Sequence, residues 1–393
     1  MAFPDRHRYS RMIGACMLGV CLMLATACTT TPAAPPAPTP TGTAAIADDV
    51  ATTLAEHDPY HGIRAVLVLE HGTRVYDRYI DSGPEDYWDI QSVTKSFVGT
   101  LVGIAIDHGL IGDVNATLGQ LLPRWTDQLT AETSAIPLWA VLTHSANFAD
   151  GSEAESAGVW SSPDPVATIL VDRARRGAGD GSFRYSNAGS HILAAVLAEA
   201  SGMPVLEFAR RYLLDPLGIA SRPALEQTVP FAPEDEAAET AAFDDADFAW
   251  PRDRQGIHIG AGPMRLRPAD LARLGQLYLD RGRWQGVQLV SSSWIDQATA
   301  PHLETAGDLD LTDHYGFQWW VASDDHYFAA MGFGGTVILV SPEHDVVVVV
   351  ASQIDADQPP AHTVKVGNAR ALAESILAEF ATAPPRAELG EPE

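Results

Sequence analysis

Residues 92–111 read SVTKSFVGTLVGIAIDHGLI, a Ser-x-x-Lys pair that opens an apolar stretch with helical periodicity. Apolar side chains recur every three or four positions from residue 93 to residue 105, and Gly109 follows them. This pattern predicts a helix with one apolar face that ends at the glycine. Because residues three apart lie on the same face of a helix, Ser92 and Lys95 are expected side by side at its start.

The lysine in this stretch is unusual for the chain. Of 25 basic residues only Lys95 and Lys365 are lysines, and the rest are arginines. A guanidinium stays protonated in proteins, whereas a desolvated ammonium can lose its proton. A serine in the first turn of a helix also has its N–H among the unpaired donors at a positive helix end. The pair therefore predicts a serine nucleophile beside a proton acceptor, with a chance Ser-x-x-Lys as the alternative.

Two further segments are candidates to complete such a site. FRYSNAGSH, residues 183–191, places Tyr185 and Asn187 directly before an apolar helical stretch. A tyrosine near an ammonium can pass protons, although on its own it could be an ordinary packing residue, and Asn187 an ordinary helix cap. MGFGGTVILVSP, residues 331–342, places glycines before a strand. These glycines permit either close approach of a ligand to the backbone or a tight turn.

The body of the chain has strand patterns at both ends and helical patterns between them. Residues 63–69 and 74–80 flank EHGT and predict a β-hairpin, and residues 336–342 and 344–352 predict two more strands. Helical patterns cover residues 165–177, 190–202, 205–218, 267–282 and 366–381. We therefore expect an α+β fold, in which both chain ends form one antiparallel sheet with flanking helices. The middle forms a mostly helical subdomain, and the site lies in the cleft between the two.

The three motifs, in this order, resemble the serine β-lactamase-like superfamily, which includes class C β-lactamases, DD-peptidases and family VIII esterases. VLTH at 141–144, LLDPLGI at 213–219 and YGFQWW at 315–320 are also similar to stretches of that superfamily. The likeness is greatest to its 6-aminohexanoate-dimer hydrolase branch. The resemblance implies a β-lactamase/transpeptidase-like fold and a serine hydrolase.

The resemblance also implies a role for each motif residue. Ser92 would form an acyl-enzyme, with Lys95 and Tyr185 as the general base and acid pair. Asn187 would orient Lys95 and the acyl side of the substrate. The oxyanion hole would use the N–H groups of Ser92 and Thr336. No metal and no organic cofactor is implied.

Two positions depart from the superfamily pattern. Phe333-Gly334-Gly335 stands where β-lactamases and DD-peptidases have Lys-Thr-Gly, so the cation that would meet a substrate carboxylate is missing. The departure favours an ester or small amide with apolar groups. Asn147 replaces a glycine, and asparagine tolerates the left-handed conformation better than most residues.

The sequence leaves two other functions open. A β-lactamase or DD-peptidase acting on cell-wall-related substrates is one alternative, and a non-catalytic surface lipoprotein is another. The chain has no Gly-x-Ser-x-Gly and no HExxH motif. With 51 acidic and 25 basic residues it is a poor partner for nucleic acid. The densest acidic run, residues 233–248, is expected to be a solvated loop. Trp319 and Trp320 are expected to pack near the cleft, with a substrate wall as the alternative.

The N-terminal sequence predicts export. Residues 1–27 contain three early arginines and then an apolar segment, as in a signal peptide. Small residues lead to Cys28 and resemble a lipobox, so we expect a lipid anchor there in the cell envelope, with simple secretion as the alternative. Residues 28–45 then predict a Pro/Thr-rich tether, 46–382 the hydrolase domain and 383–393 a disordered tail. The membrane would be contacted only through this anchor, and the other partner is a small-molecule substrate.

Overall fold

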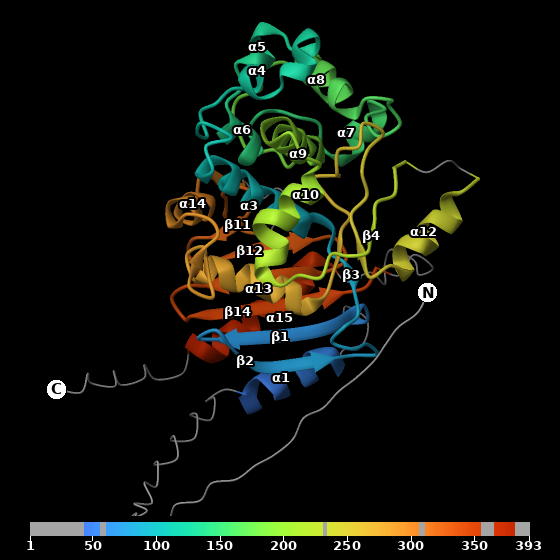
Figure 1. Cartoon of the computed structure of the whole chain (residues 1–393). Helices are drawn as coiled ribbons and strands as arrows, with labels where there is room; N and C mark the ends of the chain where they lie inside the picture. Colours follow the sequence, from blue (N-terminus) through green and yellow to red (C-terminus); the bar gives the residue numbers. More distant parts are fainter. Residues whose placement is uncertain (1–42, 56–59, 231–233, 306–310, 355–364, 382–393) are drawn as a thin grey trace, which may run out of the picture. The chain divides into compact units, whose positions relative to one another are not determined.

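The computed structural model describes residues 43–55, 60–230, 234–305, 311–354 and 365–381 (Figure 1). Their main feature is an eight-stranded antiparallel sheet with the order β2-β1-β14-β13-β12-β11-β10-β9. The strands are β1 (Ile63–Glu70), β2 (Thr73–Tyr79), β9 (Leu303–Glu304), β10 (His314–Tyr315), β11 (Trp320–Ala322), β12 (Tyr327–Gly332), β13 (Thr336–Ser341) and β14 (Val346–Ser352). Since β1 pairs with β14, the expected sheet from both ends of the chain is confirmed.

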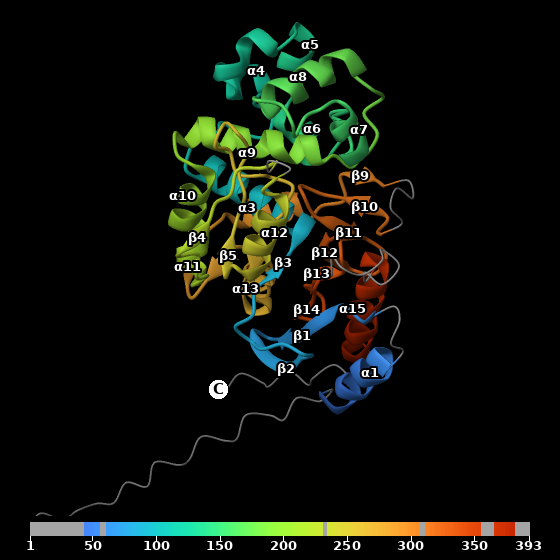
Figure 2. The ribbon, with the colours of Figure 1, turned by 90° about the vertical axis from the view of Figure 1, so that its right-hand side faces the viewer.

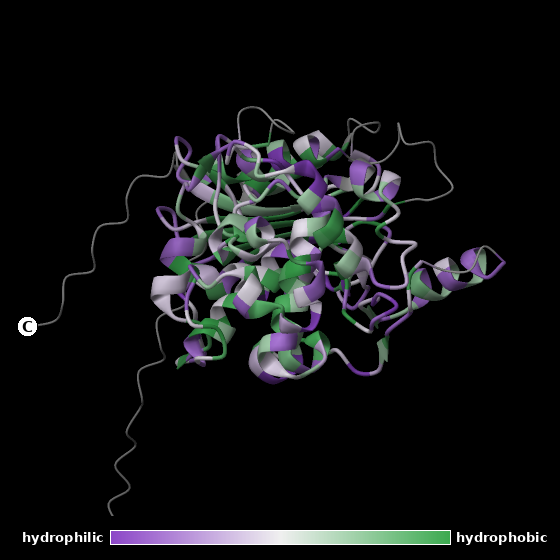
Figure 3. Cartoon of the chain, turned by 90° about the horizontal axis from the view of Figure 1, so that it is seen from above, coloured by the Kyte–Doolittle hydropathy of each residue, from purple (hydrophilic) through white to green (hydrophobic). Residues whose placement is uncertain are grey.

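Both faces of this sheet are buried, which explains why its central strands are apolar at nearly every position. Val347 and Val349 of β14 face one core cluster, and Val346, Val348 and Val350 face the other. Side chains alternate between the faces of a strand, so a continuous valine run supplies two cores at once. Green, hydrophobic strands are accordingly visible in the interior of the molecule in Figure 3.

Each face of the sheet is covered by its own helices, as Figure 2 shows. Helices α1 (Thr43–Ala55) and α15 (Val366–Ala381) contribute to the cluster on one face. Helices α3 (Thr94–Asp107) and α13 (Pro268–Leu279) contribute to the cluster on the other. The second face continues into the helical middle of the chain, so the predicted nucleophile helix lies between the sheet and that layer.

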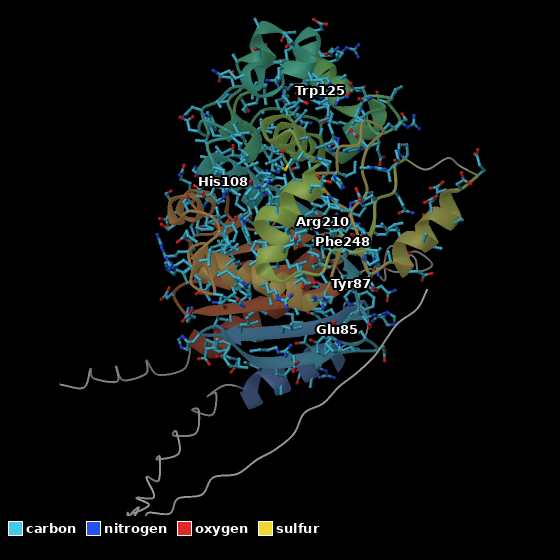
Figure 4. All side chains as sticks on the ribbon, viewed as in Figure 1. Glu85, Tyr87, His108, Trp125, Arg210 and Phe248 are labelled. Carbon is cyan, nitrogen blue, oxygen red and sulfur yellow. The ribbon has the colours of Figure 1, made fainter. Side chains whose placement is uncertain are left out.

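The helical layer is built around α9 (Asn187–Ser201), whose side chains from Ala188 to Leu197 are all buried. Its other members are α4 (Leu118–Leu121), η2 (Pro123–Gln128), α5 (Ala131–Ser134), α6 (Leu138–Leu142), α7 (Gly151–Ser156), α8 (Pro165–Arg176), α10 (Val205–Ala209), the π-helical turn η3 (Arg210–Leu214) and α11 (Asp215–Leu217). Trp125, labelled in Figure 4, ties η2 to α8 because its Nε1 donates to the Asp164 carboxylate at 3.0 and 3.1 Å.

Smaller elements connect the helical layer with the sheet. A four-stranded sheet has the order β3 (Trp88–Asp89), β6 (Arg265–Leu266), β5 (Phe248–Ala249) and β4 (Ala224–Leu225). The remaining elements are the hairpin β7 (Arg283–Trp284) and β8 (Val287–Gln288), and the helices α12 (Glu236–Asp245) and α14 (Ser292–Ala298). Strand β3 leads directly into the Ser92 turn, so this small sheet fixes where the chain enters the candidate site.

The acidic run 233–248 differs from expectation, because most of it is the helix α12 and not a loop. Alanine and glutamate are strong helix formers, and EAAETAA supplies both. Phe243 anchors the helix, since its ring is buried beneath the Arg265 guanidinium at 5.7 Å. The prediction that the run is solvated holds for its carboxylates, of which Glu236, Glu239 and Asp245 among others are exposed or half-buried.

The expected ends of the chain lie mostly outside the described residues. This applies to the signal peptide 1–27, to Cys28 and to the tail 383–393. Helix α1 begins at Thr43, within the segment 28–45 that was expected to be a tether. Among the described residues, no single helix is long and apolar enough to cross a membrane. The bent pair of helices Asn187–Ser201 and Val205–Leu217 together has the length and composition of a membrane span.

Candidate active site

Ser92 lies in a tight turn that the preceding residues shape. It belongs to the 3-10 turn η1 (Gln91–Val93), and α3 begins two residues later at Thr94. Gln91 has a φ of 47°, a conformation unusual for a non-glycine residue. Asp89 stabilises it by accepting from the Gln91 N–H at 2.9 Å and from the Gln91 side chain. Burial raises the pKa of Asp89 to about 6.

Lys95 is fully buried and is held by three oxygen atoms. Its Nζ lies 2.9 Å from Ser92 Oγ, 2.8 Å from Asn187 Oδ1 and 3.1 Å from the Ala261 carbonyl oxygen. The Asn187 and Ala261 oxygens can only accept, whereas the serine hydroxyl can also donate. A neutral amine would therefore give its two N–H groups to Asn187 and Ala261 and turn its lone pair to Ser92. Burial lowers the pKa of Lys95 to about 7, which makes the neutral amine accessible near neutral pH.

Tyr185 is the second group at Ser92. The Lys95 Nζ lies 4.8 Å from its ring centroid, and the ring stacks on Trp320 at 5.6 Å with an interplanar angle of 20°. Burial raises the pKa of the Tyr185 hydroxyl far above its ordinary value, and a hydrogen bond with Ser92 offsets only part of this. The phenol is therefore neutral and carries a proton that it can give away.

Asn187 reaches Lys95 because its neighbour provides the helix cap. Ser186, not Asn187, is the N-cap of α9: its Oγ accepts from the Gly189 N–H at 2.9 Å and donates to the Ala149 carbonyl at 2.6 Å. The Asn187 side chain is free to point across to α3. The sequence alone left open whether Asn187 was the cap, and the structure gives that role to the residue before it.

The glycine-rich segment combines both uses that the sequence left open. Gly334 and Gly335 have φ values of 84° and 89° and form the turn between β12 and β13, where a side chain would be strained. Gly332, at the end of β12, instead permits a close approach. A Cβ at Gly332 would lie 2.3 Å from the Ile90 carbonyl oxygen and 3.3 Å from the Ser92 nitrogen. The end of β12 is therefore the backbone that lies against the nucleophile.

Thr336 and Phe333 have contrasting environments. Thr336 is the first residue of β13, pairs with Gly332, and its buried hydroxyl accepts from the Ser352 N–H at 3.5 Å. Phe333, directly after Gly332, is 60% exposed, which is high for so large an apolar side chain. The expectation for Thr336 concerned its backbone N–H, and it stays a prediction. Phe333 directly follows Gly332, the residue whose backbone lies against Ser92.

The Ala261 loop is a part of the site that sequence reasoning missed. Gly260 donates its N–H to His191 Nδ1 at 3.4 Å, and His191 Nε2 lies 3.1 Å from the Asp253 carboxylate. Because Nδ1 accepts, the proton of His191 is on Nε2 and is donated to Asp253. Both side chains are buried, and they hold the loop that presents the Ala261 carbonyl to Lys95. His191 is visible in NAGSH, but no spacing in the sequence links it to Asp253.

Trp319, Trp320 and Asn147, which the sequence also singled out, have different surroundings in the structure. Trp319 packs against Tyr278 and Phe328 in the core, whereas Trp320 forms the wall behind Tyr185. Asn147 has a φ of 56°, as expected for the left-handed conformation, and its Nδ2 donates to the Gly177 carbonyl at 3.0 Å. Across the residues that the structure describes, no group of three or more His, Cys, Asp or Glu side chains is placed to hold a metal ion.

The chain is similar to a known protein family and to hydrolases within it. A family model described as Beta-lactamase matches residues 46–373. The 6-aminohexanoate-dimer hydrolase of Paenarthrobacter ureafaciens is 26% identical over 325 residues, which cover 77% of this chain and 76% of that protein. The D-alanyl-D-alanine-carboxypeptidase/endopeptidase AmpH of Escherichia coli K12 is 22% identical over 254 residues, covering 61% of this chain and 64% of that protein.

A solved structure agrees with the fold. EstCE1, described as a hydrolase with promiscuous acyltransferase activity, superposes with a TM-score of 0.64 at 16% identity, covering 85% of this chain and 99% of that one. The family resemblance and the fold expected from the sequence are therefore confirmed.

Proposed function

The chain belongs to the beta-lactamase family of hydrolases, and from this we propose that it cleaves an ester or a small amide through an acyl-enzyme on Ser92. The observation that carries the proposal is the contact set of Lys95. Its Nζ is 2.9 Å from the Ser92 hydroxyl, and its two other partners can only accept hydrogen bonds. This arrangement supports a neutral lysine whose lone pair meets the nucleophile.

Acylation follows from these contacts. Lys95 takes the Ser92 proton as Oγ forms a bond to the substrate carbonyl carbon, and the carbonyl oxygen becomes an oxyanion. The oxyanion accepts from the Ser92 N–H and from a second backbone N–H, for which we assign Phe333 in place of Thr336, since Gly332 is the residue against Ser92. Tyr185, as a neutral phenol, donates its proton to the leaving alcohol or amine when the carbonyl re-forms, and regains a proton from the Lys95 ammonium.

Deacylation reverses these roles. A water molecule loses a proton to the Lys95 and Tyr185 pair as its oxygen attacks the acyl carbon, and Ser92 Oγ leaves and recovers its proton. Both half-reactions use the same two donors to the oxyanion. No step requires a metal ion or an organic cofactor.

The charges around the site support a substrate without a carboxylate. Phe333 and the preceding β12 residues Ala330 and Met331 carry no charge. The other lysine of the chain, Lys365, immediately precedes α15, whose apolar residues pack on the opposite face of the sheet. Lys95 itself is occupied by three oxygens. A substrate with apolar acyl and leaving groups matches such a site better than one ending in a free carboxylate.

A second candidate follows from the likeness to AmpH, whose name describes a D-alanyl-D-alanine carboxypeptidase and endopeptidase. A cell-wall peptide or a β-lactam would then be the substrate. The uncharged residues at 330–333 argue against it, because such substrates present a carboxylate.

A substrate panel separates the two candidates. It contains p-nitrophenyl esters of several acyl lengths, nitrocefin, a D-alanyl-D-alanine peptide and the 6-aminohexanoate dimer, each with wild type and with Ser92→Ala. We expect ester turnover by wild type and a loss of at least about 10³-fold in Ser92→Ala. Turnover of nitrocefin or the peptide with inert esters would favour the second candidate. A Ser92→Ala protein as active as wild type would refute the mechanism.

A further inference from the structure

Gln318 has a backbone conformation that disfavours its own side chain. Its φ is 62°, in the left-handed region that glycine adopts readily and glutamine rarely does. The residue is nevertheless a glutamine with only 1% of its surface exposed. A buried amide in a disfavoured backbone conformation points to a role for the side chain.

The side chain of Gln318 is bonded to two elements of the helical layer. Its Nε2 donates to the Leu142 carbonyl at 2.7 Å and lies 3.3 Å from His144 Nε2. Its Oε1 accepts from Ser190 Oγ at 2.8 Å. Leu142 is the last residue of α6 and Ser190 lies in α9, so one amide joins these two helices and His144.

The backbone of Gln318 adds a third element. Its carbonyl accepts from Ser96 Oγ of α3 at 2.7 Å, and its N–H donates to the Leu142 carbonyl at 3.2 Å. Helix α3 has no space to spare at this contact. A Cβ on Gly99 would lie 3.0 Å from the Cβ of Gln318 and 3.2 Å from the Phe317 carbonyl oxygen.

Each of these bonds leads to a group of the candidate site. Ser96 follows Lys95 in α3, and Ser190 lies one turn after Asn187 in α9. The ring of His144 lies 5.0 Å from the ring of Tyr185. Gln318 therefore contacts a neighbour of each of the three groups around Ser92: Ser96 beside Lys95, Ser190 one turn after Asn187, and His144 against Tyr185.

The bond to His144 also decides its protonation. An amide nitrogen can only donate, so His144 Nε2 accepts and its proton lies on Nδ1. The Nδ1 has no hydrogen-bond partner among the described residues. The ionisable side chains around the ring are Tyr185, Tyr315 and, through its charge, Lys95. Burial, and then the Lys95 charge, lower the pKa of His144 well below its usual value, so the imidazole is neutral.

We propose that Gln318 is a positioning residue, which holds α3, α9 and His144 in the register that places Lys95, Asn187 and Tyr185 around Ser92. It also donates a hydrogen bond to His144 Nε2, which keeps the proton of His144 on Nδ1. The inference rests on the proposed function, because the positions it fixes matter only if Ser92 is acylated.

The substitution Gln318→Gly gives a sharp test, because it removes the hydrogen bonds of the side chain and places a residue that adopts the left-handed conformation readily. Gln285 is a matched control: it has a φ of 47°, and it is exposed in the β7–β8 hairpin. Gln318→Gly, Gln285→Gly and Ser190→Ala are compared with wild type by melting temperature, by kcat and KM on the best ester, and by the pH dependence of kcat/KM.

We expect Gln318→Gly to melt within a few degrees of wild type and to lose about 10–100-fold in kcat, with KM nearly unchanged. The rise of kcat/KM with pH should move to higher pH, because looser packing lets water reach Lys95 and raises its pKa toward the ordinary value. Ser190→Ala should show a smaller loss in kcat, and Gln285→Gly none. Unchanged kcat and pH dependence in Gln318→Gly would overturn the proposal. If that variant does not fold, unchanged kcat in Ser190→Ala would overturn it. A wild-type protein that is inert to every ester and to the 6-aminohexanoate dimer contradicts the proposed function instead, before any variant is compared.

Discussion

At the scale of single residues, the site depends on the difference between a lysine and an arginine. Lys95 is one of two lysines among 25 basic residues, and it lies buried between Ser92, Asn187 and Ala261. The sequence shows a lysine three residues after a serine. It does not show the contact with the Ala261 carbonyl, because a backbone oxygen leaves no pattern in the sequence and the buried His191–Asp253 pair places the loop.

The pKa of Lys95 predicts how activity depends on pH. Burial lowers this pKa to about 7, and only the neutral amine can accept the Ser92 proton. We therefore expect kcat/KM to rise about tenfold per pH unit below pH 7 and to level off above it. Lys95→Arg should lose about 10²–10⁴-fold at every pH, because guanidinium does not give up its proton. A kcat/KM that does not rise with pH below pH 7, or an active Lys95→Arg protein, would exclude Lys95 as the base.

At the scale of elements, the site is assembled where several elements begin or end. Ser92 precedes α3, Asn187 begins α9, and Gly332 ends β12. The helices and strands themselves follow from periodicity, and α15 spans the predicted residues 366–381. The sequence could not show which glycine meets the nucleophile, because the pairing of Gly332 with Thr336 and the packing of β12 on η1 are tertiary features.

The close approach of Gly332 predicts the effect of a single methyl group. In Gly332→Ala the new Cβ would lie 2.3 Å from the Ile90 carbonyl, so the strand end or the Ser92 turn must shift. We expect a loss of about 1–3 kcal/mol of stability and about 100-fold in kcat. Gly112→Ala is the control, since a Cβ there meets no atom within 4 Å. Melting curves and ester kinetics measure both effects, and a Gly332→Ala enzyme that behaves like the control would contradict the placement of β12.

At the scale of the whole described chain, the fold brings sequence-distant segments to one serine. The sheet joins β1 to β14, the helical layer supplies α9, and the loop at Ala261 comes from a third region. The antiparallel sheet from both chain ends was predictable, because alternating and continuous apolar runs mark its strands. Helix α12 was not predictable, because its acidic composition suggested a solvated loop. The hydrogen bonds of Gln318 were not predictable either, because they join residues far apart in the sequence.

The most direct test of the central claim is the mass of the intact protein after reaction with a fluorophosphonate, followed by peptide mapping. Such a reagent forms a covalent adduct with an activated serine hydroxyl. The account predicts one adduct per chain, located on Ser92 and absent in Ser92→Ala. It should form faster at pH 8 than at pH 6, because burial lowers the pKa of Lys95 to about 7. An adduct on another serine, or no adduct on a folded wild-type protein, would contradict it.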